Sequence, residues 1–354
     1  MNGVIDLSQL PAPEIVENID YETLLKEYYS TFIGKDSGYD ALLESDPAIV
    51  VLQSTAYREM LIRHRINETA KANLLAYAVG SDLDHKAAGY GVERLEGEDD
   101  GRLRYRCQLS LEGYSTAGPI GGYIFHALSA SVKVKSVDVD SPNPGEVVVT
   151  VLSNEGNGTP LERENLFDVA VQLKNNAVVL EGNNITDLVV KDEAGNITYT
   201  EGVDYIFDRD NSLLLRTSGS PILENVLLLL DYERADVLEL VRLQLNNEDI
   251  RPLTDMVTVQ PAEIISYAIE AEITVYPGPS FAVVENEGRE LLEQYVDERH
   301  TVGGLVAVSG IHDALHTKGV KKVKIISPAS DVETTNIQAP YCTDITLTTT
   351  VDYA

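Results

Sequence analysis

Cysteine is almost absent from this sequence of 354 residues, which contains only Cys107 and Cys342. The two cysteines lie far apart in segments that we expect to be strands, and no CxxC spacing occurs. A disulfide framework and a zinc knuckle are therefore not indicated. We expect both side chains to be buried, reduced thiols.

Long hydrophobic runs are also missing. The longest purely aliphatic run, residues 226–230, is far shorter than the roughly 20 residues that span a bilayer. The N-terminal stretch MNGVIDLSQLPAPE has neither a basic start nor an apolar run, so we expect a soluble chain with no export signal and no membrane partner. The hydrophobic fraction of 44% excludes wholesale disorder, and the length predicts two or three domains.

Basic residues are few. The sequence has 27 lysines and arginines against 57 aspartates and glutamates, which gives a formal net charge of -30 at pH 7. Because nucleic-acid binding needs several clustered phosphate contacts, we expect no nucleic-acid partner. Acidity of this degree favours solubility and basic protein partners.

The first residues predict an extended arm followed by a short helix over residues 21–32. Prolines at positions 11 and 13 prevent the apolar side chains of the arm from sharing a helix, so the arm must dock on another surface. The side chains expected to dock are Leu7, Leu10, Ile15 and Val16.

Residues 46–80 predict one long helix. Asp46 supplies an N-cap and Pro47 a first-turn proline, and no proline or glycine follows before Gly80, so the helix should have about 33 residues. One face carries a stripe that recurs every three or four residues: Ile49, Leu52, Ala56, Met60, Arg63, Asn67, Ala70, Leu74 and Tyr77. A stripe this long favours a helix bundle shared with another chain over packing within this chain. The predicted contacts are Leu52, Met60, Arg63, Asn67 and Leu74.

The stretch GSDLDHKAAG predicts the end of one helix and the start of the next. Gly80 would end the first helix, Ser81 would cap the second, and Asp84 would complete a capping box. A metal site would need further ligands beside Asp82 and His85, and the preceding helix offers only His64. We therefore predict no metal here.

The segment RLRYRCQLSL predicts a strand. Leu103, Tyr105, Cys107 and Leu109 alternate with Arg102, Arg104 and Arg106, which is the period of a strand with one buried face. The arginine row could be a solvated face, or it could be a docking strip for an acidic neighbour. Both readings remain open.

Downstream patterns predict an α+β fold: an N-terminal arm and a long bundle-forming helix, then α/β domains with an inserted small antiparallel β-domain. We place the arm and helical segment at 1–98, a first α/β unit at 99–160, the β-insert at 161–231 and a C-terminal α/β dimerisation domain at 232–354. Short apolar runs alternating with turn signals such as DEAGN define the insert.

The usual catalytic patterns are not met. GYSTAG is not the GxSxG nucleophile motif, and no glycine cluster is followed by Lys-Ser or Lys-Thr. DRDNS begins like a calcium loop, but Leu213 stands where glycine is required. His312 and His316 have a zinc-like spacing without the glutamate of HExxH. We expect no enzyme, no cofactor and no metal.

Four stretches together resemble the baseplate J family of contractile-tailed phages and phage-tail-like particles: IDLSQLPAPEIVENIDYETLL, LLAYAVGSDLDHKAAGYGVERL, YSTAGPIGGYIFHALSASVKVKSVDVDSPNPGEVVVTVL and NNEDIRPLTDMVTVQPAE. The resemblance implies a structural wedge protein of the virion tail baseplate, assembled in the host bacterial cytoplasm. Two copies would combine with one smaller wedge protein through a bundle of long helices. C-terminal domains of adjacent wedges would pair into a ring around central hub proteins, beside a sheath-initiator-like protein, and the ring would rearrange so that the sheath contracts.

The insert departs from the family pattern by roughly 70 residues, enough for a small β-sandwich. It leaves open a rival function, a tail-associated protein that binds or cleaves glycans with its site on residues 161–231. The absence of tryptophan and the presence of only 5 phenylalanines argue against stacking on sugars, although 18 tyrosines keep it open.

Overall fold

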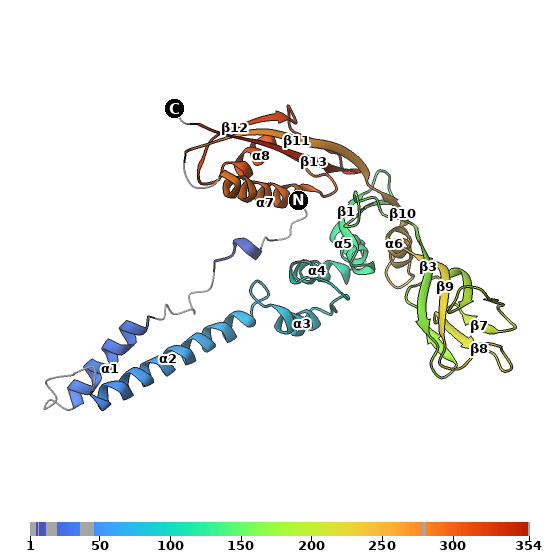
Figure 1. The fold of residues 1–354 in the computed structure, drawn as a ribbon, viewed down its shortest axis with the longest axis horizontal. Helices are drawn as coiled ribbons and strands as arrows, with labels where there is room; N and C mark the ends of the chain where they lie inside the picture. Colours follow the sequence, from blue (N-terminus) through green and yellow to red (C-terminus); the bar gives the residue numbers. More distant parts are fainter. Residues whose placement is uncertain are drawn as a thin grey trace. The chain divides into compact units, whose positions relative to one another are not determined.

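The fold was analysed in a computed structural model, which describes Ile5 and residues 7–11, 20–35, 46–115, 117–277 and 281–352. It divides into two compact units, residues 1–111 and 112–354, whose elements are drawn in Figure 1. Helices and small sheets alternate along the chain, which confirms the predicted α+β class. None of the helices in the described ranges is long and apolar enough to cross a membrane.

The first unit is helical. It contains the short 3-10 helix η1 (Leu7–Gln9) and the helices α1 (Tyr21–Lys35), α2 (Pro47–Ala72), α3 (Gly80–Gly89) and α4 (Asp100–Gly113), the last of which runs into the second unit. Asp46 caps α2 as predicted, since its Oδ1 accepts a hydrogen bond from the Ala48 amide at 2.9 Å. Helices α1 and α2 form a hairpin (Figure 1) in which Leu24, Leu25 and Ala56 are buried together.

Helix α2 has 26 residues and ends at Ala72, so the prediction of one helix as far as Gly80 is wrong. Two side-chain contacts, one local and one from a distant residue, accompany its early end. The Asn73 side chain donates to the Thr69 carbonyl at 2.9 Å, and Arg104 donates to the carbonyls of Leu75 and Ala78, both at 2.8 Å. Because these carbonyls face a guanidinium, the chain turns before Gly80.

The segment predicted as a strand is helix α4, so that prediction is wrong. Its buried residues are Leu103, Arg106, Cys107, Leu109 and Ser110, which follow a helical spacing once a buried arginine is counted among them. Arg102, Arg104 and Arg106 therefore do not form one row on a strand. Cys107 is buried as expected, but in a helix.

The second unit begins with a small α/β layer. Strands β1 (Val134–Asp140), β2 (Glu146–Ser153) and β10 (Met256–Pro261) form one sheet, in which β2 and β10 are parallel. Helices α5 (Ile120–Ala130) and α6 (Val237–Leu245) pack on it. Strand β10 follows the β-insert in the sequence, so this sheet is complete only after the chain has passed through the insert.

The inserted β-domain is a sandwich of two sheets with antiparallel ladders. One sheet has the order β3-β9-β5-β6 and the other β4-β8-β7. The strands are β3 (Arg163–Gln172), β4 (Ala177–Val179), β5 (Thr186–Asp192), β6 (Thr198–Tyr199), β7 (Tyr205–Asp208), β8 (Leu213–Arg216) and β9 (Leu227–Ala235). Leu180, Leu214 and Leu228 belong to the core between the sheets. Because Arg163 pairs with Ala235, the chain enters and leaves the sandwich at one place.

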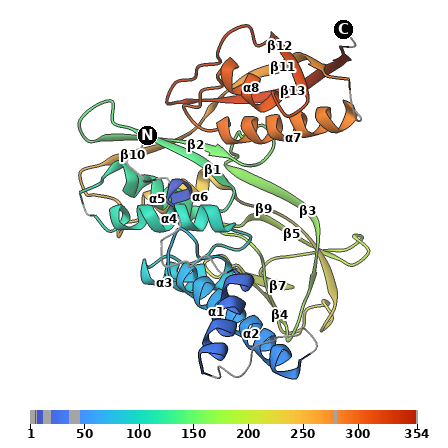
Figure 2. The same ribbon diagram turned by 90° about the vertical axis from the view of Figure 1, so that its left-hand side faces the viewer.

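The C-terminal layer is a three-stranded sheet of order β12-β11-β13 with helices on one side (Figure 2). Its elements are β11 (Glu263–Val275), α7 (Phe281–Arg299), α8 (Val308–Leu315), β12 (Val320–Ser327) and β13 (Gln338–Val351). The core contains Ile269 and Ile273 from β11, Leu292 from α7, and Ile311 and Leu315 from α8.

Two histidines of the second unit should make its stability depend on pH. Burial lowers the pKa of His126 and of His300 below the ordinary value, against an opposing hydrogen bond from each ring to a backbone carbonyl. Below a pH of about 6.5 the unfolded chain binds more protons than the folded one, so stability falls as the pH is lowered.

We expect the melting temperature to drop between about pH 7.5 and pH 5.5, and to drop less in a His300→Asn variant, whose amide can still donate to the Pro340 carbonyl. Thermal unfolding followed by circular dichroism at both pH values measures this. His64→Asn, at an exposed position on α2, is the matched control. Equal drops in His300→Asn and the wild type would contradict the assignment.

Candidate assembly interface

Arg94 ties helix α3 to the start of α4. Its Nε donates to Asp84 Oδ1 at 2.6 Å, and its guanidinium also donates to Asp100 Oδ1 at 2.7 Å and to the Glu98 carbonyl at 2.9 Å. Asp100 in turn accepts from the Gly80 amide at 3.0 Å. The Gly80 amide and the Arg94 guanidinium lower the pKa of Asp100. Asp84 is therefore an ion-pair partner of Arg94 and not the predicted capping-box acid.

Glu98 is the buried centre of the same joint. Its side chain is fully buried and accepts from Arg106 at 2.7 Å and from the Leu95 amide at 3.0 Å. The Nε of Arg102 lies 3.3 Å from Glu98 Oε1, close enough for an ion pair but without hydrogen-bond alignment. A buried carboxylate is stable only when it is paired in this way. We call residues 78–106 with these contacts the α3–α4 joint.

The three arginines that could have formed a solvated face or a docking strip belong to this joint. Arg106 is 4% exposed and binds Glu98, and Arg104 binds the carbonyls that end α2. Sequence reasoning missed Arg94, Glu98 and Asp100 as paired residues of this joint. The signal available was the run ERLEGEDDGR, in which acids and arginines are mixed at short spacing.

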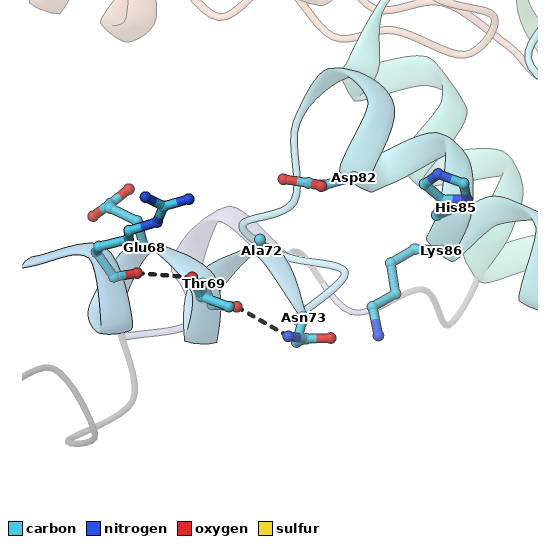
Figure 3. A pocket seen from close by; sticks show the side chains of 8 residues that line it. Glu68, Thr69, Ala72, Asn73, Asp82, His85 and Lys86 are labelled. Carbon is cyan, nitrogen blue, oxygen red and sulfur yellow. Dashed lines mark hydrogen bonds between the residues drawn. The ribbon is translucent and has the colours of Figure 1, made fainter. Parts of the chain in front are cut away.

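Asp82 and His85 face a surface hollow of about 500 Å³ between the last turns of α2 and the start of α3 (Figure 3). Thr69, Asn73 and Lys86 line the same hollow, and Asn73 is held by its bond to the Thr69 carbonyl.

Within the described ranges, no group of three or more His, Cys, Asp or Glu side chains is placed to hold a metal ion. His312 and His316 stack with ring centroids 5.5 Å apart.

Part of the predicted stripe of α2, at Ala56 and Met60, packs against α1 in its own chain. Ala56 and Asn67 are buried, and Leu52, Met60 and Arg63 are half-buried, with Arg63 paired to Glu59 at 2.7 Å. Leu74, in the turn after α2, is 38% exposed. Packing against α1 therefore accounts for Ala56 and Met60 in this stripe.

The opposite side of α2 exposes several apolar side chains. Ile62 is 61% exposed and Ile66 58% exposed, and both line a shallow hollow along the helix. The exposed apolar face, as we name it, consists of Val50, Val51, Tyr57, Leu61, Ile62 and Ile66. The sequence signal for it was the four-residue spacing of Ile62 and Ile66, which the longer stripe obscured.

The N-terminal arm docks on its own chain at two points. The Tyr77 hydroxyl donates to the Leu10 carbonyl at 2.8 Å, and the Gln108 amide donates to the Ile5 carbonyl at 2.9 Å. Leu7 is half-buried, and Leu10 is exposed. The remaining two predicted contacts, Ile15 and Val16, lie outside the described residues.

The two thiols have raised pKa values. Burial raises the pKa of Cys107 to about 11, and burial also raises the pKa of Cys342 in β13. Because the thiolate is the reactive form, both side chains are poor nucleophiles near neutral pH.

Comparison with known proteins identifies both ends of the chain. Residues 44–98 match the Baseplate J-like N-terminal domain, which covers α2, α3 and part of the joint, and residues 267–348 match the Baseplate J-like protein C-terminal domain. Baseplate protein J of Escherichia phage P2 is 31% identical over 368 residues, spanning 98% of this chain and 98% of that protein. The resemblance seen in the sequence is confirmed, and the chain belongs to the baseplate J family.

Proposed function

We propose that the chain is a wedge subunit of a contractile-tail baseplate, with a mechanical and not a catalytic role. Membership of the baseplate J family supports a structural component of a phage baseplate in the virion tail. In this proposal two copies combine with one smaller wedge protein, and the wedges join into a ring around the hub and next to a sheath-initiator-like protein.

The exposed apolar face of α2 is the observation that carries the proposal. Helix α1 covers one side of α2, while Val51, Ile62 and Ile66 are each more than half exposed on the other. Burying a side chain of this size contributes about 1.5–3 kcal/mol, so a helix that leaves several exposed has surface available for other helices. A bundle with helices of the second copy and the smaller wedge protein would cover this face.

The edge strand β13 supports pairing of the C-terminal domain with another copy. It has 14 residues and lies at the edge of the sheet order β12-β11-β13. After Pro340 it has no proline and no lysine, the residues that commonly protect an edge from pairing. We propose that residues 232–354 form the contact between adjacent wedges, and that this ring rearranges on host contact to trigger sheath contraction.

The test is the light-scattering mass of the chain, alone and co-expressed with the smaller wedge protein. We expect a complex with two copies of this chain and one of the partner. An Ile62→Asp/Ile66→Asp variant should remain folded, because both side chains are exposed, and should lose the complex. Val283→Asp, at a 64% exposed position on α7, is the control and should keep it. A wild-type chain that stays monomeric beside the partner would contradict the proposal.

A further inference from the structure

Two distant sequence stretches meet in the second unit. The Tyr123 hydroxyl, on α5, donates to Asp255 Oδ2 at 2.6 Å across 132 positions of sequence. Tyr123 is 4% exposed, and burial together with the bond to Asp255 raises its pKa. The loop of residues 250–256 is thereby fixed to the start of α5. Both stretches, GPIGGYIF and IRPLTDM, are among those that carry the family resemblance, and the α2 bundle does not use them.

The loop is braced at several further points. Gly118 has a φ of +63°, and a Cβ there would lie 3.0 Å from both Pro252 Cγ and Asp255 Oδ2, so a larger residue would push the loop away. The Asp255 amide donates to the Pro252 carbonyl at 3.1 Å and closes a tight turn. The loop therefore has a fixed backbone, and its shape does not have to be formed on binding.

The tip of this turn carries an apolar side chain that touches almost nothing. Leu253 is 99% exposed, which makes it the most exposed large hydrophobic residue described. Met256 in the same loop is 68% exposed, and Ile120 at the start of α5 is 53% exposed. An isolated leucine on a rigid loop is suited to insert into an apolar pocket on another protein.

The charged residues around the loop indicate which kind of partner pocket would fit it. Residues 111–132 contain no lysine or arginine, and the loop region 246–260 contains Glu248, Asp249 and Asp255 with a single basic residue, Arg251. The Arg251 guanidinium donates to Asn246 at 3.3 Å. A partner pocket rimmed by lysine or arginine would complement these acids, whereas the same loop of a second copy would bring acids of the same sign to the contact.

The geometry points to residues 250–256 as a docking loop whose Leu253 enters an apolar pocket, rimmed by lysine or arginine, on a different protein of the same particle. This inference rests on the proposed function only in that the chain must be part of a particle. It adds a third interface to the two already proposed, which are the exposed apolar face of α2 and the edge strand β13.

The test places the photo-crosslinking residue p-benzoylphenylalanine at position 253 of the full chain and irradiates purified particles. We expect one crosslinked particle protein, with apolar contact residues flanked by lysine or arginine. In parallel, Leu253→Asp should reduce the yield of infectious particles by at least about tenfold. Leu223→Asp, at a 70% exposed position in the β-domain, should reduce it less than about twofold.

Each outcome separates the two proposals. Particles that contain the chain but give no crosslink from position 253, or a crosslink only to a second copy, would overturn the docking loop and leave the wedge role standing. So would equal yields from the two aspartate variants. A chain absent from purified particles would contradict both.

Discussion

Replacing Arg106 with methionine is expected to lower the free energy of unfolding of the α3–α4 joint by about 3–5 kcal/mol. Arg106 is 4% exposed and the Glu98 side chain is fully buried, so the substitution leaves a carboxylate in the interior without its closest cation. Hydrogen exchange of the amides in residues 80–111, measured by mass spectrometry, reports this local loss without requiring the whole chain to unfold as one unit.

Two controls define the cause. Arg63→Met removes an arginine that is 38% exposed and paired with a partly exposed glutamate, and it should change stability by less than about 1 kcal/mol. The double variant Glu98→Leu/Arg106→Met removes both buried charges and should recover most of the stability that Arg106→Met loses. A double variant as unstable as the single one would show that packing of Arg106, and not its charge, holds the joint.

Replacing Leu228 with alanine is expected to destabilise the inserted sandwich by about 2–5 kcal/mol. Leu228 lies on β9, is 0% exposed and belongs to the core between the two sheets. The substitution opens a cavity there, because β9 is held between β3 and β5 and cannot move in to fill it. Urea unfolding, followed by hydrogen exchange of residues 163–235, measures the loss.

The matched control is Leu223→Ala, since Leu223 is 70% exposed in the same domain and should change stability by less than about 0.5 kcal/mol. Because the sandwich has its own core and its chain ends meet, residues 263–351 should keep their exchange rates in Leu228→Ala. A parallel loss of protection in β11 and β13 would mean that the two domains unfold together.

Features set by neighbouring residues were predictable. The start of α2 follows from Asp46 and Pro47, which satisfy the first helix amides whatever lies elsewhere. The sandwich follows from alternating apolar residues between turn signals, and its core contains many of them, such as Leu214 and Leu228.

Features set by distant residues were not predictable. Helix α4 was taken for a strand because a buried arginine looks like a surface residue in the sequence, and only the position of Glu98 explains its burial. The early end of α2 depends on Arg104, which lies 29 positions beyond Leu75. The packing of Ala56 and Met60 against α1 was also not predictable, because the sequence does not show that α1 folds back onto α2.

The sequence by itself determined the family, the α+β class, the acidic character and the run of short strands at its centre, because each depends on composition or on short-range pattern. Only the tertiary structure decided which face of α2 is exposed, where the arginines of α4 go, and that Tyr123 and Asp255 fix one loop. The physical reason is that burial and pairing arise between residues brought together from far apart in the sequence. Hydrophobic and ionic contacts depend on distance in space and not on separation along the chain.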